Sequence, residues 1–173
     1  MKTNSNLILL LFIAVSISFT SCKKEPGCMD PNSLTFNADA QEDDGSCVYA
    51  FDLAQGTWNI TPECDDIEIP LVGTISMDEQ LPDSIQVQGE GNSTLYIEIN
   101  TMTMNGEIDY LGNITVEEQT ISLDFGLGVP TDVQVEGSGS VSLDNTGTMD
   151  LTYSFEIPLM GTQSIDCTID LNK

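Results

Sequence analysis

Between residue 50 and the end of the chain, apolar and polar residues alternate one by one in several separate runs. The apolar positions hold mainly Ile, Leu, Val and Phe, and the positions between them hold Thr, Ser, Asp, Glu and Gln. The runs cover residues 85–88, 95–99, 121–125, 133–135, 141–143, 149–157 and 165–171. Because successive side chains of a strand point to opposite faces of a sheet, each run predicts a strand with one apolar face and one polar face. Such strands are typical of antiparallel sheets that are buried on one side.

Clusters of Gly, Asn, Asp and Pro separate these runs and predict the turns between the strands. They lie at residues 89–92, 105–106, 111–113, 126–130, 137 and 144–147. No stretch has a convincing helical periodicity. The pattern therefore predicts that residues 50–173 form one all-β domain of roughly eight to ten strands.

The chain begins with a different pattern. A single charged residue, Lys2, precedes an apolar run over residues 7–15, and small and hydroxylated residues then lead to Cys22. This order is typical of a secretory signal peptide. The apolar run is too short to cross a hydrocarbon core of about 30 Å as a permanent helix.

The tetrapeptide Phe19-Thr20-Ser21-Cys22 resembles the lipobox of bacterial lipoproteins, in which Leu is the usual residue at the position of Phe19. The resemblance implies that residues 1–21 are a lipoprotein signal peptide and that Cys22 receives lipid and becomes the new N-terminus. Because each buried CH₂ contributes about 0.8 kcal/mol, several acyl chains would anchor the protein to a membrane permanently. We expect an outer-membrane protein of the cell envelope, facing either the periplasm or the surface. The alternative is an ordinary secreted protein in which Cys22 is a spare thiol.

The number of cysteines favours lipidation. The chain has five cysteines, and an unpaired thiol in an oxidising compartment needs an explanation. Lipidation of Cys22 leaves an even set for disulfide bonding, namely Cys28, Cys47, Cys64 and Cys167.

Residues 22–49, called here the N-terminal segment, consist of a short polar tether and an acidic stretch with turn residues near both ends. A bond between Cys28 and Cys47 would stabilise it by about 3 kcal/mol in the loop-entropy model. The stretch resembles a short element, GC-DP-A-NY-A-DDGSC, of exported proteins from Bacteroidota-type bacteria. The resemblance implies an exported surface module and no particular activity. The matching residues are Cys28, Asp30, Pro31, Asn37, Ala40, Asp43, Asp44, Gly45, Ser46 and Cys47.

Four carboxylates of this segment could supply the oxygen ligands that calcium prefers, namely Asp30, Asp39, Asp43 and Asp44. Their spacing does not reproduce the calcium loop of EF-hands, because Leu34 stands where the third ligand would be. Calcium is therefore a candidate cofactor of this segment, and turn or capping roles for the same side chains are the alternative.

Gly56-Thr57-Trp58 resembles the start of the first strand in lipocalin-like barrels. The resemblance implies that Gly56 and Trp58 form the floor of the barrel. Lipocalins also stack an Arg on this Trp near the last strand, and this chain has no Arg. Pairing of Cys64 with Cys167 would make the first and last strands neighbours, as barrel closure requires, and would contribute about 4–5 kcal/mol. We predict an antiparallel up-and-down β-barrel, lipocalin-like, with an immunoglobulin-like β-sandwich as the alternative.

The amino-acid composition argues against several classes of function. The formal net charge is −24, which repels phosphate backbones and makes nucleic acid a poor partner. The chain has neither His nor Arg, so Ser-His-Asp catalysis and His-liganded zinc cannot be built. Catalysis by carboxylates alone is a minor alternative. We expect no enzymatic activity.

These features predict a non-catalytic envelope lipoprotein whose barrel binds a small apolar ligand. The alternative is a structural or adhesive surface protein with a filled barrel. Bulky residues at inward positions favour a filled interior, namely Phe125, Met149, Tyr153 and Phe155. Asp83-Ser84-Ile85 resembles a short O-glycosylation sequon of Bacteroidota-type exported proteins, which implies that Ser84 can be glycosylated.

Overall fold

A computed structural model describes residues 23–69, 73–99, 102–123, 130–157 and 160–173. The predicted signal peptide, the predicted lipidation site at Cys22 and the predicted inward residue Phe125 lie outside these ranges.

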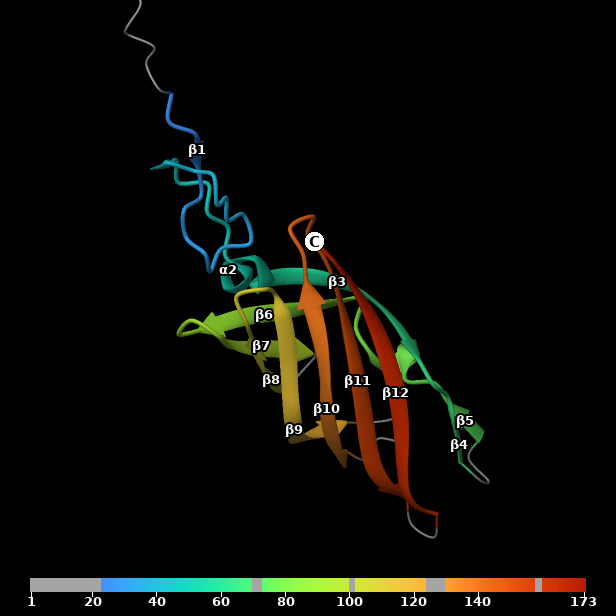
Figure 1. Ribbon diagram of the computed structural model, residues 1–173. Coiled ribbons are helices and arrows are strands. Elements are labelled where there is room, and N and C mark those ends of the chain that lie inside the picture. Colours follow the sequence, from blue (N-terminus) through green and yellow to red (C-terminus); the bar gives the residue numbers. More distant parts are fainter. Residues whose placement is uncertain (1–22, 70–72, 100–101, 124–129, 158–159) are drawn as a thin grey trace, which may run out of the picture.

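Eight antiparallel strands form a closed barrel (Figure 1). Each strand pairs with the next one along the chain, and the last strand returns to pair with the first. This is the up-and-down topology of lipocalin-like barrels, so the predicted fold class is confirmed and the alternative β-sandwich does not form. The strands are β3 (Gly56–Cys64), β6 (Ser84–Glu90), β7 (Thr94–Ile99), β8 (Met102–Ile108), β9 (Asn113–Leu123), β10 (Thr131–Val141), β11 (Thr146–Ile157) and β12 (Gly161–Asn172).

The core fills the inside of the barrel because alternate residues of every strand point inward. In β12, for example, Ile165, Cys167, Ile169 and Leu171 are buried while the residues between them are exposed. The predicted inward residues Met149, Tyr153 and Phe155 are buried in the same way on β11. Burial of each such large apolar side chain contributes about 1.5–3 kcal/mol relative to leaving it in water.

Two of the glycine turn signals were wrong. Asn105 and Gly106 lie inside β8, where Gly106 takes an inward position close to the side chains of Ile114 and Val116. Gly137 lies inside β10, where the register with β9 shifts between Val135 and Gly137. A Cβ atom at Gly137 would lie 2.1 Å from a backbone oxygen of the neighbouring strand, so close approach of backbones, and not a turn, requires this glycine.

The chain also contains two short helical elements that the periodicity did not predict. Helix α2 (Ala50–Ala54) precedes β3, and the 3₁₀ helix η1 (Asp78–Gln80) precedes β6. Both are too short to show a helical repeat.

A long connection joins β3 to β6. It contains the hairpin formed by β4 (Ile67–Ile69) and β5 (Gly73–Ile75), followed by η1. Met77, just before η1, is fully buried in the core, and the carboxylate of Asp78 accepts a 2.8 Å hydrogen bond from the backbone N–H of Cys64. These contacts hold the connection against the barrel.

The N-terminal segment lies at one end of the barrel, next to α2 (Figure 1). Its two short strands, β1 (Pro26–Gly27) and β2 (Glu42–Asp43), pair in parallel, and the predicted disulfide between Cys28 and Cys47 is present. Ser33 is buried in this segment, and its hydroxyl donates a hydrogen bond to the C=O of Val48 and accepts one from the N–H of Val48. Leu34 is the side chain of this segment that packs against the barrel core, whereas Phe36 is 46% exposed.

Candidate functional site

Gly56 and Trp58, which are predicted to form the floor of the barrel, lie at the start of β3. Gly56 begins β3 with φ of +111°, a conformation that a side chain would strain. Trp58 is 1% exposed and its indole N–H donates a 2.7 Å hydrogen bond to the carbonyl oxygen of Ala54. The bond ties β3 to the end of α2, so the helix lies across this end of the barrel.

A lysine, Lys173, contacts the Trp58 ring on which lipocalins stack an Arg. The ammonium nitrogen of Lys173 lies 4.7 Å from the centre of the Trp58 ring, within the range of a cation–π contact. The same group donates hydrogen bonds to the backbone carbonyls of Leu53 and Gln55, at the C-terminal end of α2 where a cation is favoured. Burial lowers the pKa of Lys173. The sequence offered one indication of this contact, because Lys173 is the only Lys or Arg after residue 24.

The second predicted disulfide joins Cys64, the last residue of β3, to Cys167 on the inner face of β12. These two residues are directly opposite each other in the antiparallel register of the two strands. The bond therefore lies on the seam that closes the barrel.

The barrel interior contains a cavity of about 30 Å³ among the described residues. Every side chain that lines it is apolar, including those of Trp58, Leu95 and Ile97. One water needs about 10–15 Å³ by this measure, whereas sites for small molecules have about 300–1,000 Å³. The cavity has the volume of only two or three waters and no polar group to bind one, and an apolar ligand would have to displace core side chains.

The interior also contains one polar group without a partner. The hydroxyl of Tyr153 is buried and has no hydrogen-bond partner in the structure as described. The same burial raises the pKa of Tyr153. A buried hydroxyl with no partner is unfavourable by about 1–3 kcal/mol, so this position is a weak point of the core.

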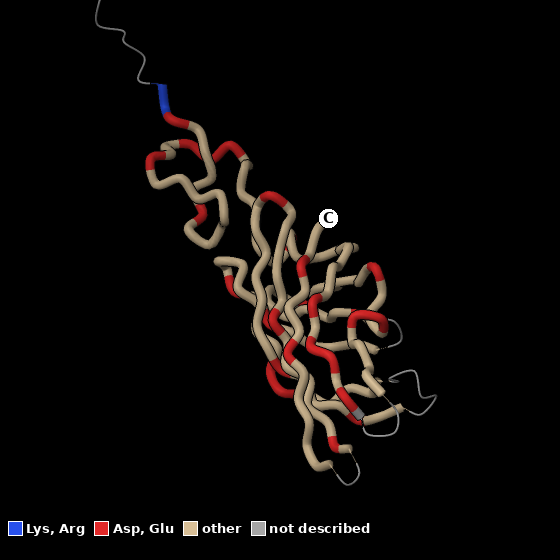
Figure 2. Tube along the Cα trace, turned by 90° about the vertical axis from the view of Figure 1, so that its right-hand side faces the viewer, with Lys and Arg blue, Asp and Glu red and all other residues tan. Residues whose placement is uncertain are grey.

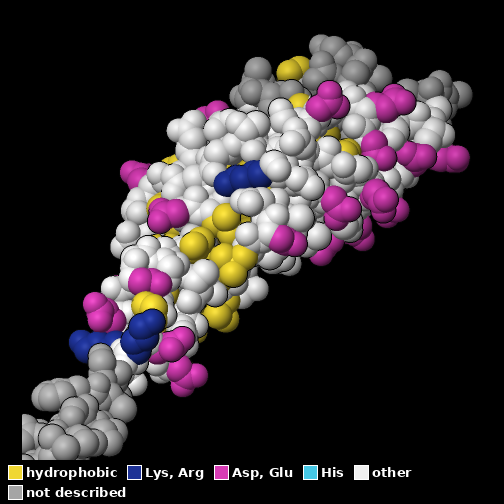
Figure 3. All heavy atoms as spheres, turned by 90° about the horizontal axis from the view of Figure 1, so that it is seen from above, with side chains coloured by type: hydrophobic (Ala, Val, Ile, Leu, Met, Phe, Trp, Pro, Cys, Tyr) yellow, Lys and Arg dark blue, Asp and Glu magenta, His cyan; other side chains and the backbone are white. Residues whose placement is uncertain are grey.

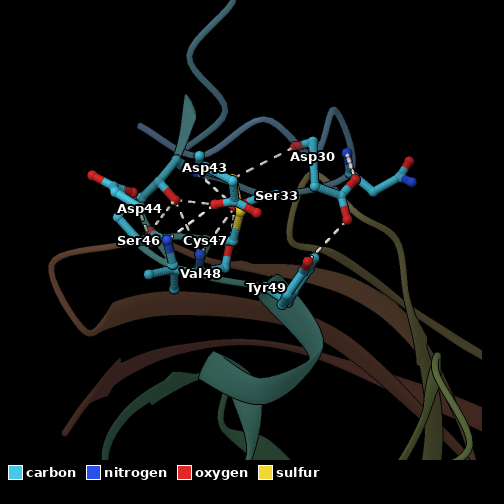
Figure 4. Close-up of a disulfide and its surroundings, with 12 residues drawn as sticks. Asp30, Ser33, Asp43, Asp44, Ser46, Cys47, Val48 and Tyr49 are labelled. Atoms are coloured by element: carbon cyan, nitrogen blue, oxygen red, sulfur yellow. Dashed lines mark hydrogen bonds between the residues drawn. A yellow bond between two sulfur atoms is a disulfide. The ribbon is translucent and has the colours of Figure 1, made fainter. Parts of the chain in front are cut away.

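The predicted calcium ligands are not brought together. Figure 4 shows Asp43 and Asp44 beside the Cys28–Cys47 bond, with Asp30 on the other side of the segment. Their carboxylates accept hydrogen bonds from backbone N–H groups two residues further on, and the Asn37 side chain does the same for the N–H of Asp39. Nowhere in the described ranges do three His, Cys, Asp or Glu residues group as a metal site requires. The geometry therefore favours the turn roles of these side chains over calcium binding.

An open cleft of about 430 Å³ lies between the N-terminal segment and the adjacent end of the barrel. One side consists of residues from the segment and α2, and the other of residues from the β6–β7 and β8–β9 loops. On the face seen from above, hydrophobic side chains gather along this boundary with acidic side chains around them (Figure 3). The lining residues are Asp30, Asn32, Tyr49, Ala50, Phe51, Asp52, Asn92, Asp109 and Tyr110.

Two of the cleft carboxylates are held in place by hydrogen bonds. Asp30 accepts bonds from the backbone N–H of Asn32 and from the Tyr49 hydroxyl, each 2.9 Å long, and together they lower its pKa. The bond to Asp30 also raises the pKa of Tyr49. Burial alone would raise the pKa of Asp109, but hydrogen bonds from Asn113 and from backbone N–H groups of its loop outweigh it and lower the pKa.

The sequence did not single out most of this cleft. The sequence suggests Asp30 as a calcium ligand, whereas nothing in it marks Asp52, Asn92, Asp109 and Tyr110 as site residues, because elements far apart in the sequence bring them together. An aromatic residue next to a predicted turn, as in Tyr110-Leu111-Gly112, was the feature of the sequence that could have indicated an exposed binding surface. Ser84, the predicted glycosylation site, is exposed at the start of β6 and does not line the cleft.

No family model, no curated protein and no solved structure matches this chain. Among the described residues, no helix is long and apolar enough to span a membrane.

Proposed function

We propose that this protein is a lipid-anchored, non-catalytic protein of the cell envelope whose filled β-barrel serves as a structural or adhesive scaffold. The observation that carries the proposal is the interior cavity of about 30 Å³, which is an order of magnitude smaller than sites for small molecules. A barrel without room for cargo exposes only its outer surface and loops to partners. Function then depends on those surfaces.

The location rests on two kinds of support. Disulfides form and persist in oxidising compartments, and this chain forms two, Cys28–Cys47 and Cys64–Cys167. The sequence before residue 23 resembles a lipoprotein signal peptide ending at Cys22. With Cys22 lipidated, the outer membrane would hold the protein by its N-terminal segment and the barrel would project from it.

The absence of catalysis is supported by the chemistry that the chain possesses. It has no His and no Arg, so the usual general base near neutral pH and the usual bidentate anion clamp are missing. Within the described part of the chain, the hydroxyl of Tyr153 is the buried side-chain polar group that has no hydrogen-bond partner, and it lies in an apolar core.

A second candidate function is transport or storage of a small apolar ligand. It is favoured by the purely apolar lining of the cavity around Trp58 and Ile97, which would suit a hydrocarbon chain. Such a ligand would require the core to open, because the cavity of the closed form is about an order of magnitude smaller than sites for small molecules.

Mass spectrometry of the protein purified from its own host would test the anchor. We expect an N-terminal peptide that begins at Cys22 and carries acyl groups, and we expect the Cys22→Ser variant to be released from the membrane without them. An unmodified Cys22 in the mature protein, or a mature N-terminus at another residue, would overturn the lipid anchor.

Native mass spectrometry of the Cys22→Ser protein would test the filled barrel. We expect the bare polypeptide mass minus four hydrogens for the two disulfides. A small apolar molecule that copurifies at one per chain would overturn the scaffold proposal and establish the carrier function.

A further inference from the structure

The cleft between the N-terminal segment and the barrel has the composition of a site for a cation. Three carboxylates and three aromatic rings line it, and none of its described lining residues is a Lys. The carboxylates belong to Asp30, Asp52 and Asp109, and the rings to Tyr49, Phe51 and Tyr110. Aromatic faces attract cations, and carboxylates pair with them, so the two kinds of side chain favour the same class of ligand.

The cleft walls are fixed before any ligand arrives. Phe51 lies directly over Gly89 of β6, where a Cβ atom would come within 2.4 Å of the ring. On the other wall, the N–H of Val141 donates a 3.0 Å bond to the C=O of Gly112, and the N–H of Ile108 donates a 2.8 Å bond to the C=O of Ser93. These bonds join the loops that carry Tyr110 and Asn92 to neighbouring strands. A preformed site loses less entropy on binding than a mobile one.

Two polar groups of the cleft are available to bind a ligand. The carboxylate of Asp52 and the hydroxyl of Tyr110 make no hydrogen bond with any residue that the structure describes. Tyr110 is 55% exposed, and Leu111, the next residue in its loop, is 59% exposed. Exposed apolar side chains beside a cleft indicate an interaction surface for a polypeptide better than a pocket for an isolated small cation.

We propose that this cleft binds an arginine or lysine side chain of a partner polypeptide, with the charged group between Asp52 and the ring of Tyr110. The inference deepens the scaffold function proposed above and rests on it. The charge of the protein favours a basic partner. Acidic residues are spread over both the N-terminal segment and the barrel, and the lysines of the segment lie at its start (Figure 2). A guanidinium group suits the cleft best, because its flat face stacks on aromatic rings while its edge binds carboxylates.

An NMR titration of residues 23–173 tests the proposal. This fragment contains both disulfides and the whole hydrogen-bonded ring of strands, so the fold is complete within it. The probe is the peptide acetyl-Ser-Gly-Arg-Gly-Ser-amide, and the control peptide has citrulline, a neutral analogue of similar shape, in place of Arg. We expect the amide signals of Asp52, Asn92 and Tyr110 to shift, with binding about tenfold tighter for the arginine peptide.

Matched variants separate a site from general attraction to an acidic surface. Asp52→Asn and Tyr110→Ala should each weaken binding about threefold. Asp132→Asn removes one charge from an exposed position on β10 outside the cleft and should leave the affinity nearly unchanged. All three variants should keep the chemical shifts of the barrel core, which shows that they are folded.

Three results would overturn the proposal: equal binding of the citrulline peptide, equal weakening by Asp132→Asn and Asp52→Asn, or shifts spread over the outer faces of the strands. Each of them concerns the cleft alone. Failure of the scaffold function would instead appear as a bound apolar molecule or an unlipidated Cys22 in the mass spectra, so the two failures are distinguishable.

Discussion

The ammonium group of Lys173, the last residue of the chain, lies 4.7 Å from the centre of the Trp58 ring at the start of the first barrel strand. It also donates hydrogen bonds to the carbonyls of Leu53 and Gln55 at the end of α2. One side chain thus joins three parts of the fold: the C-terminal end of β12, Trp58 on β3 and the end of α2.

Removing this contact should destabilise the barrel. We expect Lys173→Ala to lower the free energy of unfolding by about 1–2 kcal/mol, from the loss of the cation–π contact and two hydrogen bonds. Lys173→Arg should recover most of the loss because it keeps the charge over the ring. Urea unfolding followed by fluorescence measures both, since Trp58 is the only tryptophan. An unfolding midpoint unchanged in Lys173→Ala would show that the contact contributes nothing.

The two disulfides should differ in what they stabilise. The Cys64–Cys167 bond spans 103 residues and closes the barrel, so replacing both cysteines by serine should cost about 4–5 kcal/mol in the loop-entropy model. The Cys28–Cys47 bond spans 19 residues inside the N-terminal segment, and its removal should leave the unfolding of the barrel nearly unchanged.

Thermal unfolding of the two double variants, followed by Trp58 fluorescence, compares them directly. The Cys28/Cys47 variant is the matched control, because it also loses one disulfide and gains two serines. If both variants lowered the melting temperature equally, the N-terminal segment and the barrel would have to unfold as one unit.

The unpartnered hydroxyl of Tyr153 predicts a stabilising substitution. Tyr153→Phe removes the buried hydroxyl while keeping the ring in the core, and should raise the free energy of unfolding by about 1 kcal/mol. Tyr49→Phe is the control, because the Tyr49 hydroxyl bonds to Asp30. Chemical denaturation measures both. Destabilisation by Tyr153→Phe would mean that the hydroxyl is bonded in solution, for instance to a water or to a ligand in the barrel.

Acid should loosen the N-terminal segment through Asp30. Bonds from the N–H of Asn32 and the Tyr49 hydroxyl hold the pKa of Asp30 below its ordinary value of 3.8 in the folded protein. A carboxylate with a lowered folded pKa contributes stability that is fully present above its unfolded pKa and is lost as the pH falls through the folded pKa. The contribution of Asp30 should therefore disappear only below about pH 4.

An NMR titration of the side-chain carboxyl carbons measures this effect. In Tyr49→Phe the pKa of Asp30 should rise toward 3.8, while the pKa of Asp144, lowered chiefly by the hydroxyls of Ser142 and Thr146 at another turn, should not move. If the pKa of Asp30 were the same in both proteins, the Tyr49 hydroxyl would not be bonded to it.

The sequence predicted the barrel because its signal is local and repeated. Alternation along β11 and β12 shows directly which residues point inward, and the position of Cys167 opposite Cys64 makes the first and last strands neighbours. Two turn predictions that were based on glycines were wrong for a physical reason. Gly is favoured both in turns and in strands whose backbones approach each other closely. Gly106 and Gly137 therefore gave the same signal as a true turn at Gly112, which has a positive φ of 90°.

The candidate sites were harder to predict because they depend on contacts between distant residues. Lys173 contacts Trp58 only because barrel closure pairs β12 with β3. The cleft residues Asp52, Asn92 and Tyr110 come from α2 and two loops, and no spacing in the sequence relates them. Bulky inward residues such as Phe155 predicted that the interior cavity would be small. Its volume could not be predicted, because it depends on how all the inward side chains pack together.

The two disulfides also limit how far the chain can be stretched. Under a force applied between its two ends, the tension bypasses the residues between Cys28 and Cys47 and those between Cys64 and Cys167 through the sulfur bonds. Most of the contour length is thereby shielded, and the part that can extend is confined to the tether, residues 48–63 and the last few residues. A chain anchored at its N-terminal segment and pulled at its C-terminal residues would then lengthen only slightly before the load reached covalent bonds.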